Sequence, residues 1–148
     1  MIRSLLPLLL AGAAFGSVSE DLQRFEGFSA TSYVDTTGHL SVGYGHRTDK
    51  SVTMSRKTAL AVLADDIAKA EQGARLVVPS YDSQPQHVQD VLVETVFQLG
   101  PAGMRKFIKF GQAIQASNYA LASACLIDSR FHRQCPARCE ALARKLNP

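Results

Sequence analysis

The fold is decided by residues 26–46, which read EGFSATSYVDTTGHLSVGYGH. From residue 32 to residue 46 the chain alternates, and the alternation centres on Thr37-Gly38. Alternation of this kind around a turn-forming pair is typical of two short strands joined by a tight turn. The stretch therefore predicts a β-hairpin.

A short helix is expected directly before the hairpin, over residues 21–26, where Leu22 and Phe25 are apolar and three apart. Residues 17–20 read SVSE, which fits the S-x-x-E capping box that starts a helix. Gly27 provides a C-terminal stop. The helix is therefore expected to end at Glu26, the first residue of the quoted stretch.

Helices predominate after Asp49, where apolar residues recur at helical spacing. One helix, capped by Thr53, is expected to run to about Arg75, and a second from Gln86 to Leu99, before Gly100-Pro101. The residues expected to face inward are Leu60, Leu63, Ile67 and Ala70 in the first, and Val88, Leu92, Thr95, Val96 and Leu99 in the second. Shorter helices fit residues 104–116, 118–127 and 136–146. The prediction is an α+β, mostly α fold, with a small β-hairpin lobe and a larger helical lobe flanking a cleft.

Composition and charge limit the class of protein. The chain has 148 residues, about one domain's worth, and its 46% apolar and 20% charged residues are ordinary for a globular protein. Residues 1–98 hold 8 Lys/Arg against 11 Asp/Glu, a net charge of −3, whereas residues 99–148 hold 8 against 2, a net charge of +6. The basic part is either a solvated surface or a region attracted to a polyanion such as membrane or anionic cell wall. Nucleic acid is disfavoured because basic and aromatic residues do not interleave.

The N-terminal segment, residues 1–19, is set apart from an expected catalytic domain over residues 20–148. After Arg3 come sixteen uncharged residues, SLLPLLLAGAAFGSVS, which follow the plan of a secretory signal, with Ala11-Gly12-Ala13 as a cleavage site. The segment is short for a membrane-spanning helix, which needs about 20 residues. Three interpretations stay open: an uncleaved export-and-release anchor with transient membrane contact, a cleaved signal, and a helix packed on the domain or on a partner protein.

The three cysteines, Cys125, Cys135 and Cys139, fit no zinc pattern, because no second pair completes a tetrahedral site. We interpret them as small buried hydrophobic residues. In an oxidising compartment, one disulfide from Cys125 to either of the others is the alternative.

Two carboxylates and a hydroxyl are candidates for chemistry. Glycoside hydrolysis needs two carboxylates on opposite sides of the scissile bond, and Glu26 and Asp35 lie at the end of the short helix and in the first strand. The hairpin turn brings Ser41 beside Asp35, so that its hydroxyl could hold a water molecule. Spacing alone is weak support, since a Glu and an Asp nine residues apart are usually surface charges.

Several strings in a fixed order give stronger support. They are Glu26-Gly27-Phe28, Tyr33-x-Asp35-x-x-Gly38, Val42-Gly43-Tyr44-Gly45-His46, Val78-Pro79-x-Tyr81-Asp82-Ser83, Val96-Phe97-Gln98-Leu99-Gly100 and Ser129-Arg130-Phe131-x-x-Gln134-x-Pro136-x-Arg138. Together they closely resemble the phage-type lysozymes (glycoside hydrolase family 24), from about Asp21 to the C-terminus. That family's pattern is a catalytic Glu, an Asp nine residues later, a Thr six after that, and a G-x-G-H turn.

The resemblance implies a lysozyme-like fold and a role for each matching residue. Glu26 would be the general acid and Asp35 the base that positions water. The family inverts the anomeric centre, which requires carboxyl groups about 6.5–9.5 Å apart. Ser41 departs from the family's usual Thr, which keeps the hydroxyl but loses a methyl worth on the order of 1 kcal/mol of packing. The expectation is therefore activity, at a full or a reduced level, with an inactive or differently tuned variant as the alternative.

Other matching residues have a structural and a functional interpretation. His46 is expected to be structural, with Asp66 as its partner. Gln98, Phe107 and Gln134 match positions that line the family's glycan cleft, and their alternatives are a helix cap, a core aromatic and a surface amide. The resemblance implies no metal and no cofactor.

The leading hypothesis is a muramidase that cuts the β-1,4 bond between N-acetylmuramic acid and N-acetylglucosamine in the peptidoglycan glycan strand. It would be a phage endolysin exported to the host periplasm, or a virion-associated lysozyme that opens the wall at entry. It is expected to be a monomer unless docked in a virion, and no nucleic-acid partner is expected. The alternatives from other classes are a non-catalytic wall-binding module and a membrane-disrupting protein.

Overall fold

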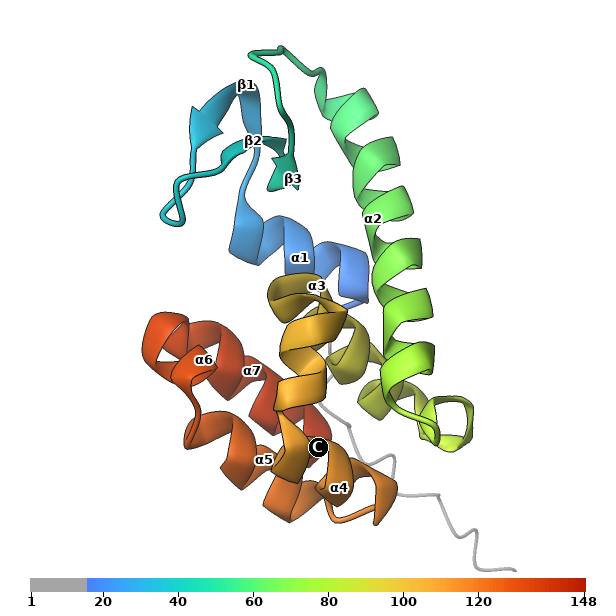
Figure 1. Cartoon of the computed structure of the whole chain (residues 1–148). Coiled ribbons are helices and arrows are strands. Elements are labelled where there is room, and N and C mark those ends of the chain that lie inside the picture. The colour runs from blue at the N-terminus through green and yellow to red at the C-terminus, as the bar shows by residue number, and fades with distance from the viewer. Residues whose placement is uncertain (1–15) are drawn as a thin grey trace, which may run out of the picture.

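The predicted hairpin is present in the computed structural model, which describes residues 16–148. Strand β1 (Ser29–Val34) pairs antiparallel with β2 (Leu40–Gly43), and Tyr33 lies opposite Ser41. A third short strand, β3 (His46–Arg47), lies on the other side of β2. The sheet forms the small lobe (Figure 1).

Helix α1 (Val18–Glu26) begins and ends as its sequence indicates. Ser17 accepts a hydrogen bond from the backbone N–H of Glu20, whose side chain bonds back, so the capping box is confirmed. Gly27 ends the helix with a φ of 68°, which glycine adopts without strain. The first two residues of α1 belong to the segment that the sequence set apart as residues 1–19. The expectations for the rest of that segment fall on residues 1–15, outside the described part of the chain.

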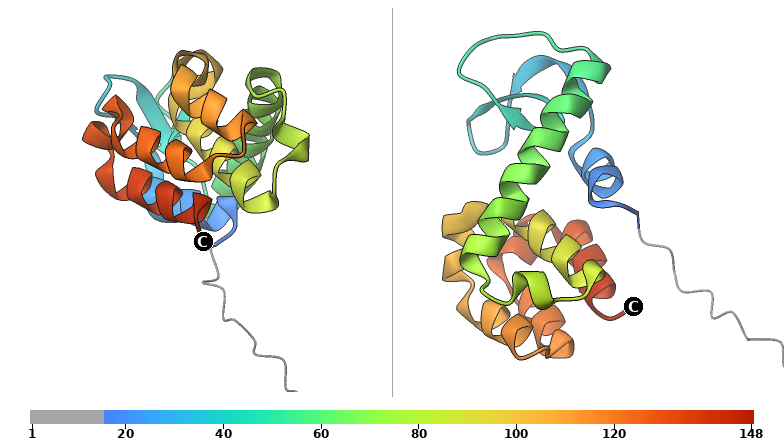
Figure 2. Two further views of the ribbon diagram at one scale, coloured as in Figure 1. Left: turned by 90° about the horizontal axis from the view of Figure 1, so that it is seen from below. Right: turned by 90° about the vertical axis from the view of Figure 1, so that its right-hand side faces the viewer.

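Helix α2 (Arg56–Val77) runs from the sheet to the helical lobe (Figures 1 and 2). The prediction that Thr53 caps this helix is wrong. Thr53 forms a β-bridge with Thr31, and Ser55 caps the helix. The prediction that Leu60 faces inward is also wrong, since this side chain is 40% exposed. Its neighbour Ala59 fills that place, because the backbone of β2 approaches too closely for a larger side chain.

The larger lobe is helical and is built around α3. Its elements are η1 (Tyr81–Ser83), α3 (Gln86–Lys106), α4 (Ile108–Gln115), α5 (Tyr119–Ile127), α6 (Arg130–Gln134) and α7 (Pro136–Leu146). Six successive residues of α3, from 91 to 96, are buried, so helices surround it on most sides. This core is the main hydrophobic cluster of the described residues.

Two helix boundaries in this lobe differ from the prediction. The chain leaves helical geometry at Gly100 (φ 71°, ψ 165°), as predicted, but it resumes the helix at once and continues to Lys106. The helix expected over residues 104–116 is therefore divided at Phe107, whose ψ of 58° separates α3 from α4. Helix α6, capped by Ser129, was not predicted.

The mostly α, α+β class is confirmed. The prediction that the cysteines are small buried hydrophobic residues is confirmed for Cys139, whereas Cys125 and Cys135 are half-buried against the main hydrophobic cluster. All three are free thiols, so neither alternative disulfide is formed. Cys139 is buried, and burial raises the pKa of its thiol to about 12. In residues 16–148 no helix combines the length and the apolar character needed to cross a bilayer.

Candidate active site

Asp35 lies at the start of the hairpin turn, and its carboxylate organises that turn. Oδ1 accepts hydrogen bonds from the Thr37 hydroxyl (2.7 Å), the Thr37 N–H (2.8 Å) and the His39 N–H (3.0 Å). Oδ2 accepts one from the Ser41 hydroxyl at 3.3 Å. The side chain of Thr37 is the main reason that the pKa of Asp35 is lowered to about 2. Asp35 is therefore ionised at neutral pH.

Ser41 lies beside Asp35, as the hairpin register predicts, and is only 2% exposed. Its hydroxyl has the carboxylate as its hydrogen-bond acceptor, so the polar group that the family's Thr supplies is retained. The hydroxyl therefore lies next to the carboxylate, although Ser41 itself does not line the pocket that contains Glu26 and Asp35.

Replacing Thr37 with Val should raise the pKa of Asp35 from about 2 towards the usual 3.8, because the strongest hydrogen bond to the charged form is lost. A folded-state pKa below the unfolded value stabilises the fold above that unfolded value, and this contribution disappears as pH falls through the folded value. In the wild type this stabilisation is lost between about pH 4 and pH 2, and in Thr37→Val that pH range should be narrower. Carboxyl ¹³C NMR titration checks this, with Thr36→Val as control; an unchanged Asp35 titration would contradict the assignment.

Glu26 is the last residue of α1, and the hairpin backbone approaches it closely. A Cβ on Gly45 would lie 2.9 Å from Glu26 Oε2, and Gly45 has a φ of 77°. The positive φ favours glycine here, and a side chain would displace the Glu26 carboxylate. The G-x-G-H turn of the sequence thus brings the small lobe against the carboxylate.

A buried arginine contacts the other carboxylate oxygen of Glu26. Arg138 of α7 is 5% exposed, and its Nη1 donates to Glu26 Oε1 at 2.7 Å and to Gln98 Oε1 at 2.5 Å. Its guanidinium also lies over the ring of Phe25, 5.6 Å from the centroid. The predicted cleft residue Gln98 is therefore next to the predicted acid, and both contact the same cation.

Arg138 was not predicted as a site residue, although the pattern of buried residues in its helix indicates one. The buried residues of α7 are Arg138, Cys139, Leu142, Lys145 and Leu146. Their spacing is that of one helix face, so two cations occupy an otherwise apolar stripe. Buried cations need anionic partners, and this pattern could have predicted carboxylates from elsewhere in the chain.

Glu26 and Asp35 line one pocket of about 400 Å³ between the lobes. The other lining residues are Thr36, Thr37, Gly45, Arg47, Phe97, Gln98, Leu99 and Gly100. Tyr33 is a neighbour of both carboxylates: burial raises the pKa of its phenol, and the charges of Glu26 and Asp35 raise it further. The two candidate carboxylates thus line the same pocket.

Phe107 and Gln134 line a different pocket, together with Lys106 and Arg130. Phe107 is half-buried and stacks on Phe110, with ring centroids 4.8 Å apart. Gln134 is exposed at the end of α6. Of the three predicted cleft residues, only Gln98 therefore lies in the pocket that holds the carboxylates.

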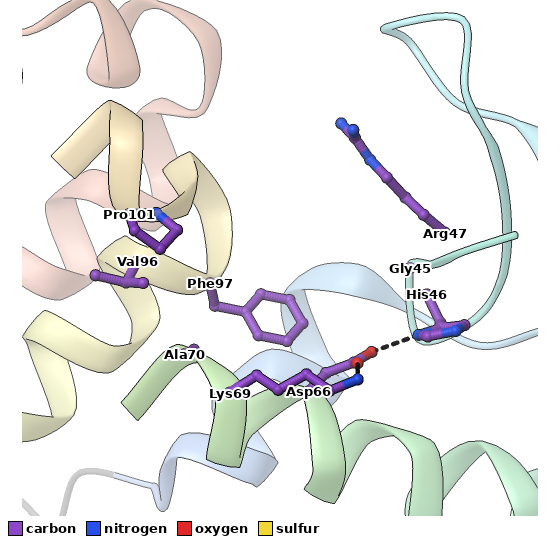
Figure 3. A pocket seen from close by; sticks show the side chains of 9 residues that line it. All are labelled: Gly45, His46, Arg47, Asp66, Lys69, Ala70, Val96, Phe97 and Pro101. Carbon is purple, nitrogen blue, oxygen red and sulfur yellow. Dashed lines mark hydrogen bonds and ion pairs between the residues drawn. The ribbon is translucent and has the colours of Figure 1, made fainter. Parts of the chain in front are cut away.

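His46 and Asp66 form the predicted contact between β3 and α2. Their Nδ1 and Oδ2 atoms are 2.7 Å apart, and Lys69 lies 3.8 Å from the other carboxylate oxygen. Figure 3 shows this group at one wall of a pocket whose opposite side is formed by Phe97, Val96 and Pro101. The imidazole is engaged by α2, which agrees with a structural role.

A helix-end glutamate and a hairpin aspartate that share a pocket between two lobes define a lysozyme-like protein. Residues 23–144 match the model of the phage lysozyme family, and the chain belongs to that family. It is also 28% identical, over 135 residues, to the peptidoglycan hydrolase gp36 of the Pseudomonas phage phiKMV. The match covers 87% of this chain and 15% of that protein, so the chain spans a small part of the relative's length.

Proposed function

We propose that the protein is a muramidase, which hydrolyses the β-1,4 bond between N-acetylmuramic acid and N-acetylglucosamine in peptidoglycan. The observation that carries the proposal is the different environment of two carboxylates in one pocket. Four hydrogen bonds keep Asp35 ionised, whereas Glu26 is held at the junction of the lobes by Arg138 and approached by Gly45. Family membership and the peptidoglycan hydrolase gp36 support the same substrate.

In this proposal Glu26 acts in its protonated form, with the proton on Oε2, the oxygen that Arg138 does not contact, and donates this proton to the glycosidic oxygen as the bond breaks. Asp35, with Ser41, orients a water molecule for attack from the opposite face of the sugar. The low pKa of Asp35, about 2, makes it a weak base, so it acts chiefly by orienting water and by stabilising positive charge on the sugar. Water attack opposite the leaving group inverts the anomeric centre.

The anomer of the first product tests this part of the proposal. Inversion of a β bond releases an α reducing end, which ¹H NMR resolves on a soluble glycan before mutarotation. An initial α signal supports direct attack by water, and an initial β signal would show a covalent intermediate instead.

We further propose that the substrate is met in the host periplasm and that the basic C-terminal part assists binding to anionic wall. Residues 99–148 carry a net charge of +6, with 8 Lys/Arg against 2 Asp/Glu, which supports attraction to a polyanion. In this role the protein is an endolysin that lyses the host at the end of infection. The virion-associated role is distinguished by antibody labelling of purified particles, which should be negative.

One comparison separates the glycosidase from a membrane-disrupting protein. The purified protein is given peptidoglycan sacculi in one vessel and dye-filled vesicles of anionic phospholipid in another. The proposal predicts that sacculi clear and that vesicles stay intact on the same timescale. Vesicle leakage with intact sacculi would overturn it, and binding to sacculi without clearing would indicate a wall-binding module.

A further inference from the structure

Two buried cations of α7 hold helix α1 at two levels. Arg138 contacts Glu26 and Gln98, which we call the upper layer. Lys145, seven residues further along α7, contacts Asp21 and Glu94, which we call the lower layer. Each layer contains a cation from α7, a carboxylate from α1 and a polar side chain from α3.

The lower layer is more deeply buried than the upper one. Lys145 Nζ donates to Asp21 Oδ2 at 2.6 Å and to Glu94 Oε1 at 2.7 Å, and the three side chains are 3%, 10% and 1% exposed. Glu94 lies one helical turn before Gln98, so both point to the same side of α3. The two layers are thus stacked along the same three helices.

Helix α1 has few apolar side chains that fix its position. Of its residues only Asp21 and Leu22 are buried. Leu22 packs in the small apolar cluster with Tyr44, Ala59 and Leu63, which belong to the side of the sheet and α2. Val18 also packs against the main hydrophobic cluster, and the other contacts of α1 with α7 and α3 described here are those of the two polar layers.

A buried ionic cluster is a costly way to stabilise a fold, since apolar residues of similar size are often equally good. Burial tends to lower the pKa of Lys145, and the bonds with Asp21 and Glu94 outweigh it and raise this pKa. Burial nevertheless raises the pKa of Glu94, so the cluster does not fully repay the desolvation of that carboxylate. Geometric specificity, which directional contacts provide, is the advantage that remains.

We propose that Lys145, Asp21 and Glu94 are positioning residues, which fix the placement of α1 and thereby hold Glu26 where it acts. The inference rests on the proposed function, in which Glu26 is the acid. A displacement of about 1 Å in a reacting group can cost a hundredfold in rate. The lower layer would prevent such a displacement from a distance, without touching the substrate.

The test replaces the whole layer, because removing Lys145 alone would leave Glu94 buried without a cation and Asp21 with only the exposed Arg24. The variant is Asp21→Asn/Glu94→Gln/Lys145→Met, which is neutral and similar in volume. The matched control is Glu71→Gln/Arg75→Met/Asp82→Asn, which removes an exposed cation with two carboxylate partners on α2 and η1. The unfolding midpoint, kcat and KM on soluble glycan are measured for both.

The proposal predicts that kcat falls about tenfold or more in the lower-layer variant, while KM and the unfolding midpoint stay near the wild-type values. The control should keep the wild-type kcat. A lower-layer variant that is folded and has the wild-type kcat would overturn the proposal, as would a rise in KM alone.

A spectroscopic readout separates this inference from the proposed function. The NMR signals of the Arg138 guanidinium and the Glu26 carboxyl report their contact in the protein without substrate. The proposal predicts that these signals shift or broaden in the lower-layer variant and not in the control. If the wild type cleaves no glycan, the muramidase proposal fails. If the Arg138 and Glu26 signals are unchanged in the lower-layer variant, the positioning role fails, whatever the wild type cleaves.

Discussion

Glu26→Gln should lower kcat by about 10²–10⁴-fold, because an amide cannot donate the proton that the leaving oxygen requires. Its structure should be retained, since the amide oxygen can still accept from Arg138 Nη1, at the place where the carboxylate accepts at 2.7 Å. The initial rate of reducing-sugar release from soluble glycan measures the effect, and the unfolding midpoint checks the fold.

Glu140→Gln is the matched control for this prediction. Glu140 is a glutamate of α7 that contacts His132, and its side chain is 51% exposed. The control should keep the wild-type rate. A Glu26→Gln protein that hydrolyses glycan within a few-fold of the wild-type rate would remove Glu26 from the mechanism.

Lys145→Met should lower the free energy of unfolding by about 3–5 kcal/mol, the usual cost of breaking a buried ion pair from one side. The change leaves Glu94 buried without a cation and leaves Asp21 with only the exposed Arg24, 3.2 Å away; the side chains of Asp21 and Glu94 are 10% and 1% exposed. Urea unfolding monitored by circular dichroism measures the loss.

Arg75→Met provides the comparison on the surface. Its partners Glu71 and Asp82 have side chains 39% and 75% exposed, so water replaces the lost contacts and the expected cost is below about 1 kcal/mol. Equal effects of the two substitutions would contradict the assignment of Lys145 to a desolvated cluster.

Local signals in the sequence predicted the hairpin and the first helix correctly. The turn at Thr37-Gly38, the capping box of Ser17 and Glu20, and the stop at Gly27 all depend on residues within a few positions of each other. The contact of Ser41 with Asp35 was predicted from the hairpin register alone. These features were predictable because hydrogen bonds between near neighbours determine them.

The contact of His46 with Asp66 was predicted, but other features set by packing between distant segments were not. Leu60 was expected inside, but the close approach of β2 admits only Ala59 there. The break at Gly100 was predicted, whereas the resumption of the helix after it was not. Glycine and proline indicate where a helix ends, but packing against other segments determines whether the chain becomes helical again.

The site shows the same division. Glu26 and Asp35 were found from an ordered set of strings, whereas Arg138, 112 residues from Glu26, was given no role. The partners of a buried cation cannot be read from its own neighbours in the chain. Phe107 and Gln134 were grouped with Gln98 through the resemblance, and the geometry places them in another pocket.

The most direct test of the muramidase proposal is the identity of the new ends in digested peptidoglycan. Purified sacculi are digested with the wild-type protein, reduced with borohydride and analysed by mass spectrometry. We predict that every new end is a reduced N-acetylmuramic acid, because water attacks the muramic acid side of the bond. New ends of reduced N-acetylglucosamine, or cleavage confined to the peptides, would contradict it.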